Sequence, residues 1–124
     1  DWEQNNESLV LKLTYKGTGF LFTGDIENDV MKTLKADEIT ADVIQSPHHG
    51  SKSSDDKDFY KNTSADCSVI SVGKDNSYKH PHKEHLDALS ENGIKVFRTD
   101  ECGTIHFKVD GKGNIKYKTD GGLQ

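Results

Sequence analysis

The sequence predicts an α/β domain in which helices flank a mixed β-sheet. Three observations predict it: short apolar runs with strand-like spacing, helical stretches between them, and paired strands joined by turns at both ends. Alternating strands and helices favour a parallel sheet, whereas terminal hairpins add antiparallel pairs. The 124 residues fit one domain. We expect a single domain over residues 1–124, with disordered ends at 1–6 and 119–124.

The first two elements are expected to form a hairpin. In "SLVLKLTY" (8–15) every second residue is apolar, which places these side chains on one face of a strand. The side chains on that face are Leu9, Leu11, Leu13 and Tyr15. The turn residues "KGTG" (16–19) separate this strand from "FLFT" (20–23), so the two strands are expected to pair.

A helix is expected next, because the apolar period changes after the second strand. Val30, Met31 and Leu34 fit one helical face, and Asp25 stands where a capping residue would. "ADVIQS" (41–46) is a short apolar run between polar flanks, which predicts a buried strand.

Two more helices and a strand follow. Serines and early acids mark a helix start in "SSDDKDFYKN" (53–62), before the buried strand "CSVISVG" (67–73). "PHKEHLDALSENG" (81–93) predicts a helix that begins at Pro81 and stops at Gly93.

The chain is expected to close with the strand "IKVFRT" (94–99) and a second hairpin. "DECGT" (100–104) is expected to be a turn that enters this hairpin. The two strands, "TIHFKV" (104–109) and "NIKYKT" (114–119), flank the turn "DGKG" (110–113).

Composition narrows the classes of function. Hydrophobic residues make up 31% of the chain, so its core is thin. The formal net charge of −5 lacks the overall basic footprint of a nucleic-acid-binding domain. No apolar run approaches the roughly 18 residues of a membrane span, so no direct membrane insertion is expected. Cys67 and Cys102 are too few for a disulfide framework, and whether they pair stays open.

Polar residues with chemical potential follow three of the predicted strands. Asp25 follows the second strand, His48 and His49 follow the third, and residues 74–82 follow the fourth. Ligands of α/β sheets gather beyond the carboxyl ends of the strands. We therefore expect these three groups to lie at one edge of the sheet.

The adjacent histidines in "SPHHGSKSS" (46–54) are the strongest candidates for metal binding. Neighbouring residues of an extended backbone point in opposite directions, so at most one of His48 and His49 is expected to bind a metal directly. The other would orient the ligand or meet the substrate. Asp25 is either a helix N-cap or a carboxylate ligand at the strand end.

The candidate substrate-binding residues are Ser51, Lys52, His80 and His82. The hydroxyls and amides after Gly50 suit an oxyanion or a phosphate. His80 and His82 flank a proline; either His80 caps the helix and His82 is exposed, or both donate to a phosphate. No role is assigned to the remaining histidines, which are expected on the surface or on a sheet face: His85 and His106.

Four segments, in this order, resemble the C-terminal half of a metallo-β-lactamase-fold domain of the subtype fused to ComEC-type DNA-uptake proteins. They are "NESLVLKLTYKGTGFLFTGDIE", "ADVIQSPHHGSKSS", "SVISVGKDNSYKHPHKEHLDAL" and "GIKVFRTDECGTI", and together they extend from about Asn6 to about Val109. The resemblance implies one half of an αββα sandwich, whose complete domain holds two divalent metal ions, zinc or manganese.

The resemblance also implies roles for single residues. Asp25 corresponds to the carboxylate that bridges the two metals, and His49 to the last histidine ligand, with His48 in reserve. His80 and His82 match a segment that approaches the substrate. The implied activity is metal-assisted hydrolysis, of the phosphodiesterase or nuclease type, on DNA or another phosphodiester during DNA uptake (competence).

One departure from the family limits these expectations. The family's His-x-His-x-Asp-His segment does not occur in these 124 residues. Catalytic zinc sites keep about three protein ligands, so the chain alone is expected to bind metal weakly or not at all and to be inactive or nearly so. The absent N-terminal half would leave an apolar sheet face, which that half or a second copy of the chain would cover. The resemblance places the domain at the extracytoplasmic face of a bacterial membrane protein.

Two alternative functions remain. The serine and histidine clusters could hold phosphate or DNA without metal, as a non-catalytic binding module. The chain could also belong to a small-molecule esterase or lactonase of the same superfamily.

Overall fold

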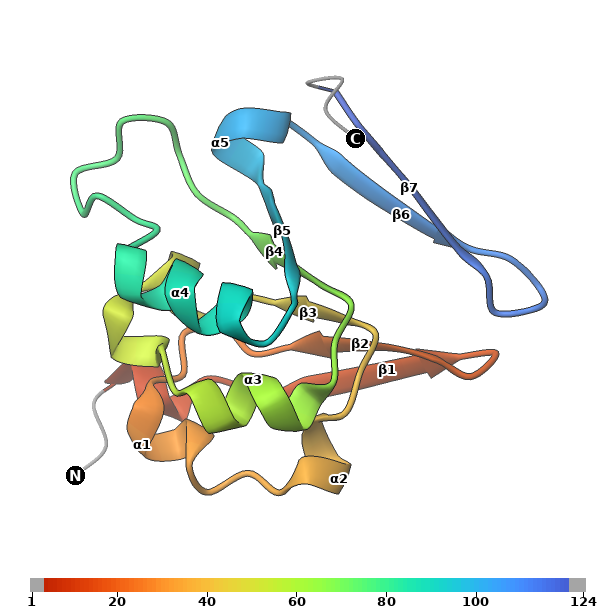
Figure 1. Ribbon diagram of the computed structural model, residues 1–124, viewed down its shortest axis with the longest axis horizontal. Helices are drawn as coiled ribbons and strands as arrows, with labels where there is room; N and C mark the ends of the chain where they lie inside the picture. Colours follow the sequence, from red (N-terminus) through yellow and green to blue (C-terminus); the bar gives the residue numbers. More distant parts are fainter. Residues whose placement is uncertain (1–3, 121–124) are drawn as a thin grey trace.

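The computed structural model describes residues 4–120 and consists of a five-stranded sheet, a separate two-stranded sheet and short helices (Figure 1). The strands are β1 Leu11–Tyr15, β2 Thr18–Phe22, β3 Val43–Gln45, β4 Cys67–Ile70, β5 Lys95–Arg98, β6 Ile105–Val109 and β7 Ile115–Thr119. The helices are α1 Asn28–Met31, α2 Ala36–Ile39, α3 Lys57–Thr63, α4 Lys83–Glu91 and α5 Thr99–Cys102, with 3-10 turns η1 Gln4–Glu7, η2 Pro47–Gly50 and η3 Lys52–Ser54.

The large sheet is mixed, as the sequence predicts. Its order is β1-β2-β3-β4-β5; β1 pairs antiparallel with β2, and every later neighbour is parallel. The C-terminal hairpin also forms, but β6 and β7 pair only with each other. It therefore lies beside the sheet as a separate ribbon (Figure 1).

Helices cover one face of the large sheet. Leu21, Ile44 and Ile70 point to that face and are almost inaccessible to solvent. They belong to the main core, together with Tyr60 from α3 and Leu89 from α4. The thin core expected from the composition is thus concentrated on the helical side.

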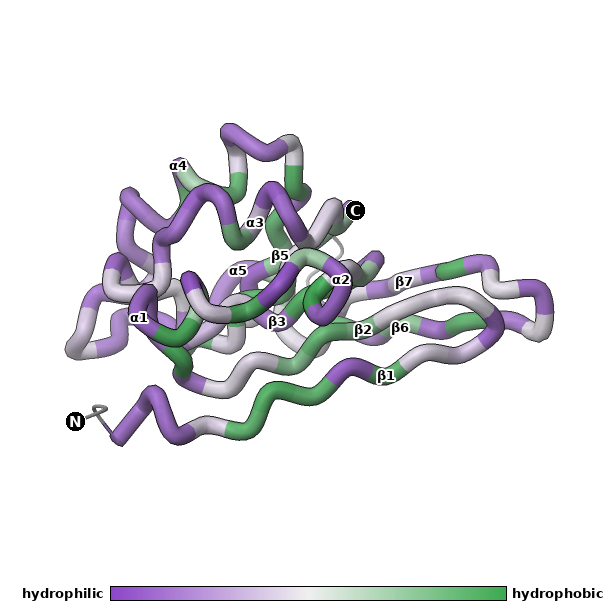
Figure 2. The backbone as a smooth tube through the Cα atoms, turned by 90° about the horizontal axis from the view of Figure 1, so that it is seen from below, coloured by the Kyte–Doolittle hydropathy of each residue, from purple (hydrophilic) through white to green (hydrophobic). Residues whose placement is uncertain are grey.

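The opposite face is covered only in part. The β6–β7 hairpin packs Phe107 and Tyr117 against Phe97 and Val43, which forms a second, smaller core. Beyond the hairpin, the apolar face of β1 and β2 stays uncovered, and the hydrophobic stretch of β1 lies at the margin of the fold away from α3 and α4 (Figure 2). Its large side chains are between 44% and 78% exposed: Leu9, Leu11, Leu13, Tyr15 and Phe22.

The helices differ most from the sequence prediction. The helix expected after the second strand is only one turn long, and its N-cap residue is Glu27, so Asp25 is not a helix cap. A second short helix, α2, was not predicted. The last long helix begins at Lys83 and not at Pro81, because the backbone of its N-cap residue His82 is extended, with φ −80° and ψ 150°.

The chain ends are described in part. Disorder was expected at 1–6 and 119–124, and residues 1–3 and 121–124 lie outside the described residues. Within the expected ends, residues 4–6 belong to η1, where buried Asn6 accepts a hydrogen bond from the Glu27 amide at 2.7 Å, and Thr119 closes β7. Cys67 and Cys102 are buried free thiols. Among residues 4–120, no helix is long and apolar enough to cross a membrane.

Candidate functional site

The loops after β2, β3 and β4 meet at one edge of the sheet, as expected for strand ends. His49 Nε2 lies 3.8 Å from Asp25 Oδ1. The ring of His80 lies 5.7 Å from that of His48 and 6.2 Å from that of His49, measured between centroids. Four residues from three loops therefore form one cluster.

Both adjacent histidines have a strained backbone. The φ angles of His48 and His49 are 52° and 55°, in the left-handed region that few residues other than glycine adopt. The backbone here is not extended, so the expected reason for their divergence is wrong. The two rings nevertheless face different partners. Such strain persists where surrounding contacts enforce it and is common at functional sites.

Gly50 allows this loop to meet the segment that carries His80. Its φ is +81°, and a Cβ atom there would lie 2.6 Å from Cβ of Pro81. The carbonyl of Gly50 accepts from the His82 amide at 2.9 Å, and the Lys52 amide donates to Nδ1 of His82 at 2.9 Å. Close packing and two hydrogen bonds thus fix the loops together.

His49 has the environment of a metal-binding histidine. Its Nδ1 lies 2.7 Å from the carbonyl oxygen of Ser71, which can only accept. In the neutral ring Nδ1 therefore carries the proton, and the lone pair of Nε2 is directed towards the carboxylate of Asp25. A backbone carbonyl that fixes the tautomer in this way is the usual outer partner of a ligating histidine. The side chains of His49 and Asp25 are 53% and 42% exposed, so the pair is open to a ligand.

His48 is enclosed by protein groups instead. Its Nδ1 lies 3.1 Å from Glu27 Oε2, without the alignment of a hydrogen bond, and Nε2 lies 3.4 Å from the side-chain nitrogen of Asn5. Both ring nitrogens face the protein, and the ring does not share the Asp25 contact. Of the two histidines, His49 is the better placed ligand.

Asp25 is positioned by its backbone. Its amide donates to the hydroxyl of Ser8 at 3.0 Å, and the preceding Gly24 has a φ of +59°. A Cβ atom at Gly24 would lie 2.8 Å from Cβ of Ser8. The glycine therefore permits the close approach of Ser8, which holds the Asp25 backbone at the strand end.

His80 lies at the centre of the ring cluster. Burial, and then the neighbouring His82, His48 and His49, lower its pKa below the ordinary histidine value. It also stacks on Tyr78, with ring centroids 5.6 Å apart. A neutral imidazole in this position can sit beside other histidines without electrostatic repulsion.

Two of the predicted substrate-binding residues have their polar side-chain atoms engaged within the protein. His82 accepts from the Lys52 amide through Nδ1, and its Nε2 lies 3.1 Å from the carbonyl of Tyr78. The buried hydroxyl of Ser51 accepts from the Ser53 amide. These contacts fix the loops. The side chain of Lys52, in contrast, is exposed to solvent.

His85 was expected on the surface or on a sheet face, and both expectations are wrong, because it lies in α4. The residue is fully buried, with Nδ1 3.1 Å from the Ser51 carbonyl and Nε2 3.1 Å from the Ser46 hydroxyl. Burial lowers its pKa to about 4. The available signal was helical spacing, because Ala88 and Leu89, three and four residues later, are core residues.

The described residues supply two facing donors for a cation, and no more. Among residues 4–120, no three His, Cys, Asp or Glu side chains are placed to hold one metal ion. The carboxylate of Asp25 and the fixed lone pair of His49 suit a divalent cation. Completing the usual three or more ligands would require donors from elsewhere.

Comparisons with known proteins relate the chain to proteins of natural competence. No family model matches it. It is 39% identical over 109 residues to ComE operon protein 3 of Bacillus subtilis, which covers 85% of the chain and 14% of that protein. It is 32% identical over 108 residues to Competence protein ComA of Neisseria gonorrhoeae, covering 85% of the chain and 16% of that protein.

Recombination protein 2 of Haemophilus influenzae is a third relative. It is 29% identical over 101 residues, which covers 82% of the chain and 13% of that protein. The chain thus spans about a seventh of the length of the relatives that it matches.

Proposed function

Because the chain is homologous over most of its length to a segment of competence proteins, we propose that it is the C-terminal part of a metal-dependent hydrolase domain. The domain would have the metallo-β-lactamase fold and act on DNA, or another phosphodiester, during DNA uptake. The five-stranded mixed sheet with helices on one face supports half of such a sandwich.

The pairing of Asp25 with His49 carries this proposal. His49 Nε2 faces the carboxylate at 3.8 Å, and Ser71 fixes the tautomer that leaves this nitrogen unprotonated. Asp25 and His49 would hold one side of a two-cation centre, with zinc or manganese as the ions. The chemistry that such cations supply is polarisation of a phosphoryl oxygen and acidification of a water molecule.

The other residues of the cluster would shape the surroundings of this centre. His80, neutral and partly exposed, lies against His49 and is the cluster residue best placed to contact a substrate. Lys52 would offer a positive charge to a phosphate. Ser51, His82 and buried His85 would position the loop, since their polar atoms bond to its backbone.

The remaining ligands would come from an N-terminal half-domain. That half would pack on the uncovered apolar face of β1 and β2 and contribute the His-x-His-x-Asp-His segment. In its absence a second copy of the chain would cover the face. By the same resemblance, the domain would lie at the extracytoplasmic face of a bacterial membrane protein.

The alternatives receive less support at this site. A phosphate-binding module would need free donors, yet Nε2 of His82 faces the Tyr78 carbonyl, and the Ser51 hydroxyl is buried and accepts from the Ser53 amide. A small-molecule esterase or lactonase would use the same two donors, so it differs from the proposal only in its substrate.

Hydrolysis by the full-length protein that contains this chain tests the proposal. With manganese or zinc, we expect cleavage of labelled DNA. Asp25→Asn and His49→Ala should each lower kcat/KM by at least about 100-fold, because loss of even an outer partner of a ligand costs about 10–100-fold. Asp29→Asn, an exposed carboxylate on α1, is the matched control and should retain activity.

Cleavage that survives both site substitutions would refute the assignment. Hydrolysis of esters or lactones with no action on phosphodiesters would instead identify the small-molecule alternative.

A further inference from the structure

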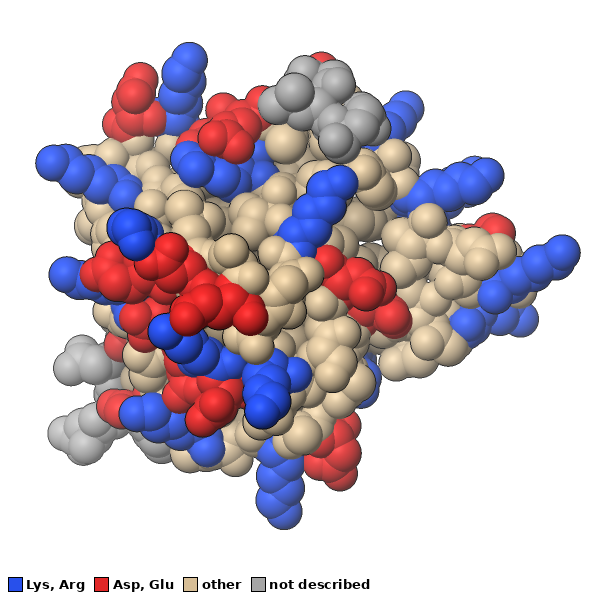
Figure 3. Space-filling view, viewed as in Figure 1, with Lys and Arg blue, Asp and Glu red and all other residues tan. Residues whose placement is uncertain are grey.

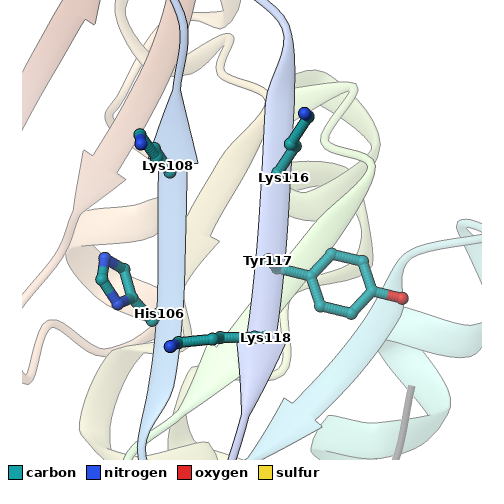
Figure 4. A pocket seen from close by; sticks show the side chains of 5 residues that line it. All are labelled: His106, Lys108, Lys116, Tyr117 and Lys118. Carbon is teal, nitrogen blue, oxygen red and sulfur yellow. The ribbon is translucent and has the colours of Figure 1, made fainter.

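The β6–β7 hairpin has two faces of opposite chemistry. Alternate residues of both strands turn inwards, where Phe107 and Tyr117 pack against the large sheet. The residues between them are exposed on the outer face: His106, Lys108, Lys116 and Lys118. Figure 4 shows His106 and Lys108 on β6 beside Lys116 and Lys118 on β7.

The outer face brings basic side chains directly opposite one another, and one of the pairs consists of two lysines. Lys108 pairs with Lys116 across the ribbon, and His106 pairs with Lys118. Like charges in such cross-strand positions are destabilising. Among residues 4–120, no carboxylate lies within ion-pair distance of these three lysines, although Lys57 and Lys83 form ion pairs on the helices. Folding alone gives no reason for this arrangement.

The local charge differs from that of the whole chain. Residues 104–119 contain four lysines and one aspartate, a formal charge of +3, in a chain of net charge −5. That aspartate, Asp110, is used by the turn, where it accepts from the amides of Lys112 and Asn114. Lysines project from the hairpin at the right of Figure 3. Lys108, Lys116 and Lys118 line a shallow depression of about 300 Å³ together with His106 and Tyr117.

The hairpin that carries the basic face contacts the large sheet at its tip and at its base. At the tip, the hydroxyl of Thr18 donates to the carbonyl of Gly113 at 2.6 Å, beside the start of β2. At the base, β6 follows α5, whose Thr99 bonds to Val72. Val72 adjoins Ser71, the residue that holds His49. The ribbon therefore begins at the edge of the sheet where the candidate site lies.

We propose that the outer face of the β6–β7 hairpin binds the sugar–phosphate backbone of a nucleic acid. Lysines on a ribbon are point charges suited to successive phosphates, and they carry no sequence information. A two-stranded ribbon also has the dimensions of the DNA major groove. An anionic membrane fits less well, because Tyr117 is the one residue lining the depression with an apolar ring to insert among lipids, and its hydroxyl is bonded to Lys95. This surface extends the proposed function and needs no metal.

Salt-dependent binding tests the proposal. The chain is titrated, in EDTA, against a fluorescent duplex and a single strand in an anisotropy assay. With three lysines on the outer face and exposed Lys112 in the turn, four phosphate contacts are expected. Raising the salt from about 50 to about 200 mM should therefore weaken duplex binding by roughly 100-fold. The triple variant Lys108→Gln/Lys116→Gln/Lys118→Gln keeps only Lys112 among the lysines of the hairpin. It should bind the duplex weakly, and its affinity should change only about 3- to 4-fold over the same range of salt.

A matched variant separates a local surface from overall charge. Lys32→Gln/Lys35→Gln/Lys61→Gln removes the same charge from the helical side of the molecule and should retain the parent's affinity within about twofold. The hairpin variant relieves like-charge contacts, so its thermal unfolding should be no less cooperative than the parent's. That measurement distinguishes lost binding from lost folding.

Three results would overturn the inference: no binding by the parent chain, equal losses in both triple variants, or binding to anionic lipid vesicles but not to nucleic acid. Because EDTA removes divalent ions, the outcome is independent of Asp25 and His49. Failure of the hairpin surface would leave the hydrolase proposal standing, and loss of hydrolysis would leave the hairpin surface standing.

Discussion

Two histidines at the loop after β3, His49 within it and His85 packed behind it, have opposite chemical environments. His49 is half exposed, and one of its nitrogens is free to act as a donor to a cation. His85 is fully buried behind the same loop, between the Ser46 hydroxyl and the Ser51 carbonyl. The first setting favours ligand binding. The second requires a neutral ring that positions the loop.

The buried ring makes stability depend on pH. Burial lowers the pKa of His85 to about 4 from an ordinary 6.5, despite opposing effects of the Ser51 carbonyl and Asp55; His80 lowers it further. Nearby Tyr60 has a pKa raised by burial and stays neutral. Between pH 4 and pH 6.5, His85 binds more protons in the unfolded chain than in the folded chain. The contribution is therefore complete above pH 6.5 and is lost as the pH falls towards 4.

Replacement by glutamine tests this contribution. A shift of this size corresponds to roughly 3 kcal/mol between the two pH limits. We expect the free energy of unfolding, measured with urea at pH 7 and near pH 4.5, to fall more for the parent chain than for His85→Gln. The variant should be less stable at pH 7, because it loses buried hydrogen bonds. Equal pH dependence in the two proteins would contradict the assignment.

At the scale of elements, strands were predicted better than helices. The two-residue apolar period places β1, β2 and the C-terminal hairpin within a few residues of their observed positions. The predicted extent of the helix after β2 was wrong, because a capping side chain and three apolar residues do not show that the helix ends at Met31. The sequence also cannot show that β6 and β7 pack on the sheet instead of joining its edge, because that choice depends on packing between distant segments.

The uncovered face of β1 and β2 leads to a prediction about association. Leu11, Leu13 and Tyr15 are each about half exposed on one face of β1, beside Phe22. Soluble monomers seldom expose a contiguous apolar patch of this kind. We expect the isolated chain to dimerise with increasing concentration in size-exclusion chromatography with light scattering. Leu11→Lys/Leu13→Lys should shift it to the monomer.

The control for association lies on the other face of the same strand. Lys12→Gln changes a residue that points away from the patch and should leave the dimer intact. A parent chain that stays monomeric at high concentration would refute self-association through this face.

At the scale of the whole molecule, the location of the candidate site followed from chain order, and its details did not. Strand ends of an α/β sheet meet at one edge, which brought Asp25, His49 and His80 together. The contacts that distinguish His49 from His48 come from Ser71 and Glu27, which carry no signal in the sequence. Contacts between a histidine ring and residues from other loops depend on tertiary packing.

The central claim is that this chain supplies two ligands of a cation centre and leaves the others to a partner. It is tested most directly by titrating zinc into the chain while NMR records the ¹⁵N shifts of its imidazole rings. We predict weak binding in fast exchange that perturbs Nε2 of His49, leaves its Nδ1 protonated, and disappears in Asp25→Asn. Tight stoichiometric binding, or a saturable response that spares His49, would contradict the claim.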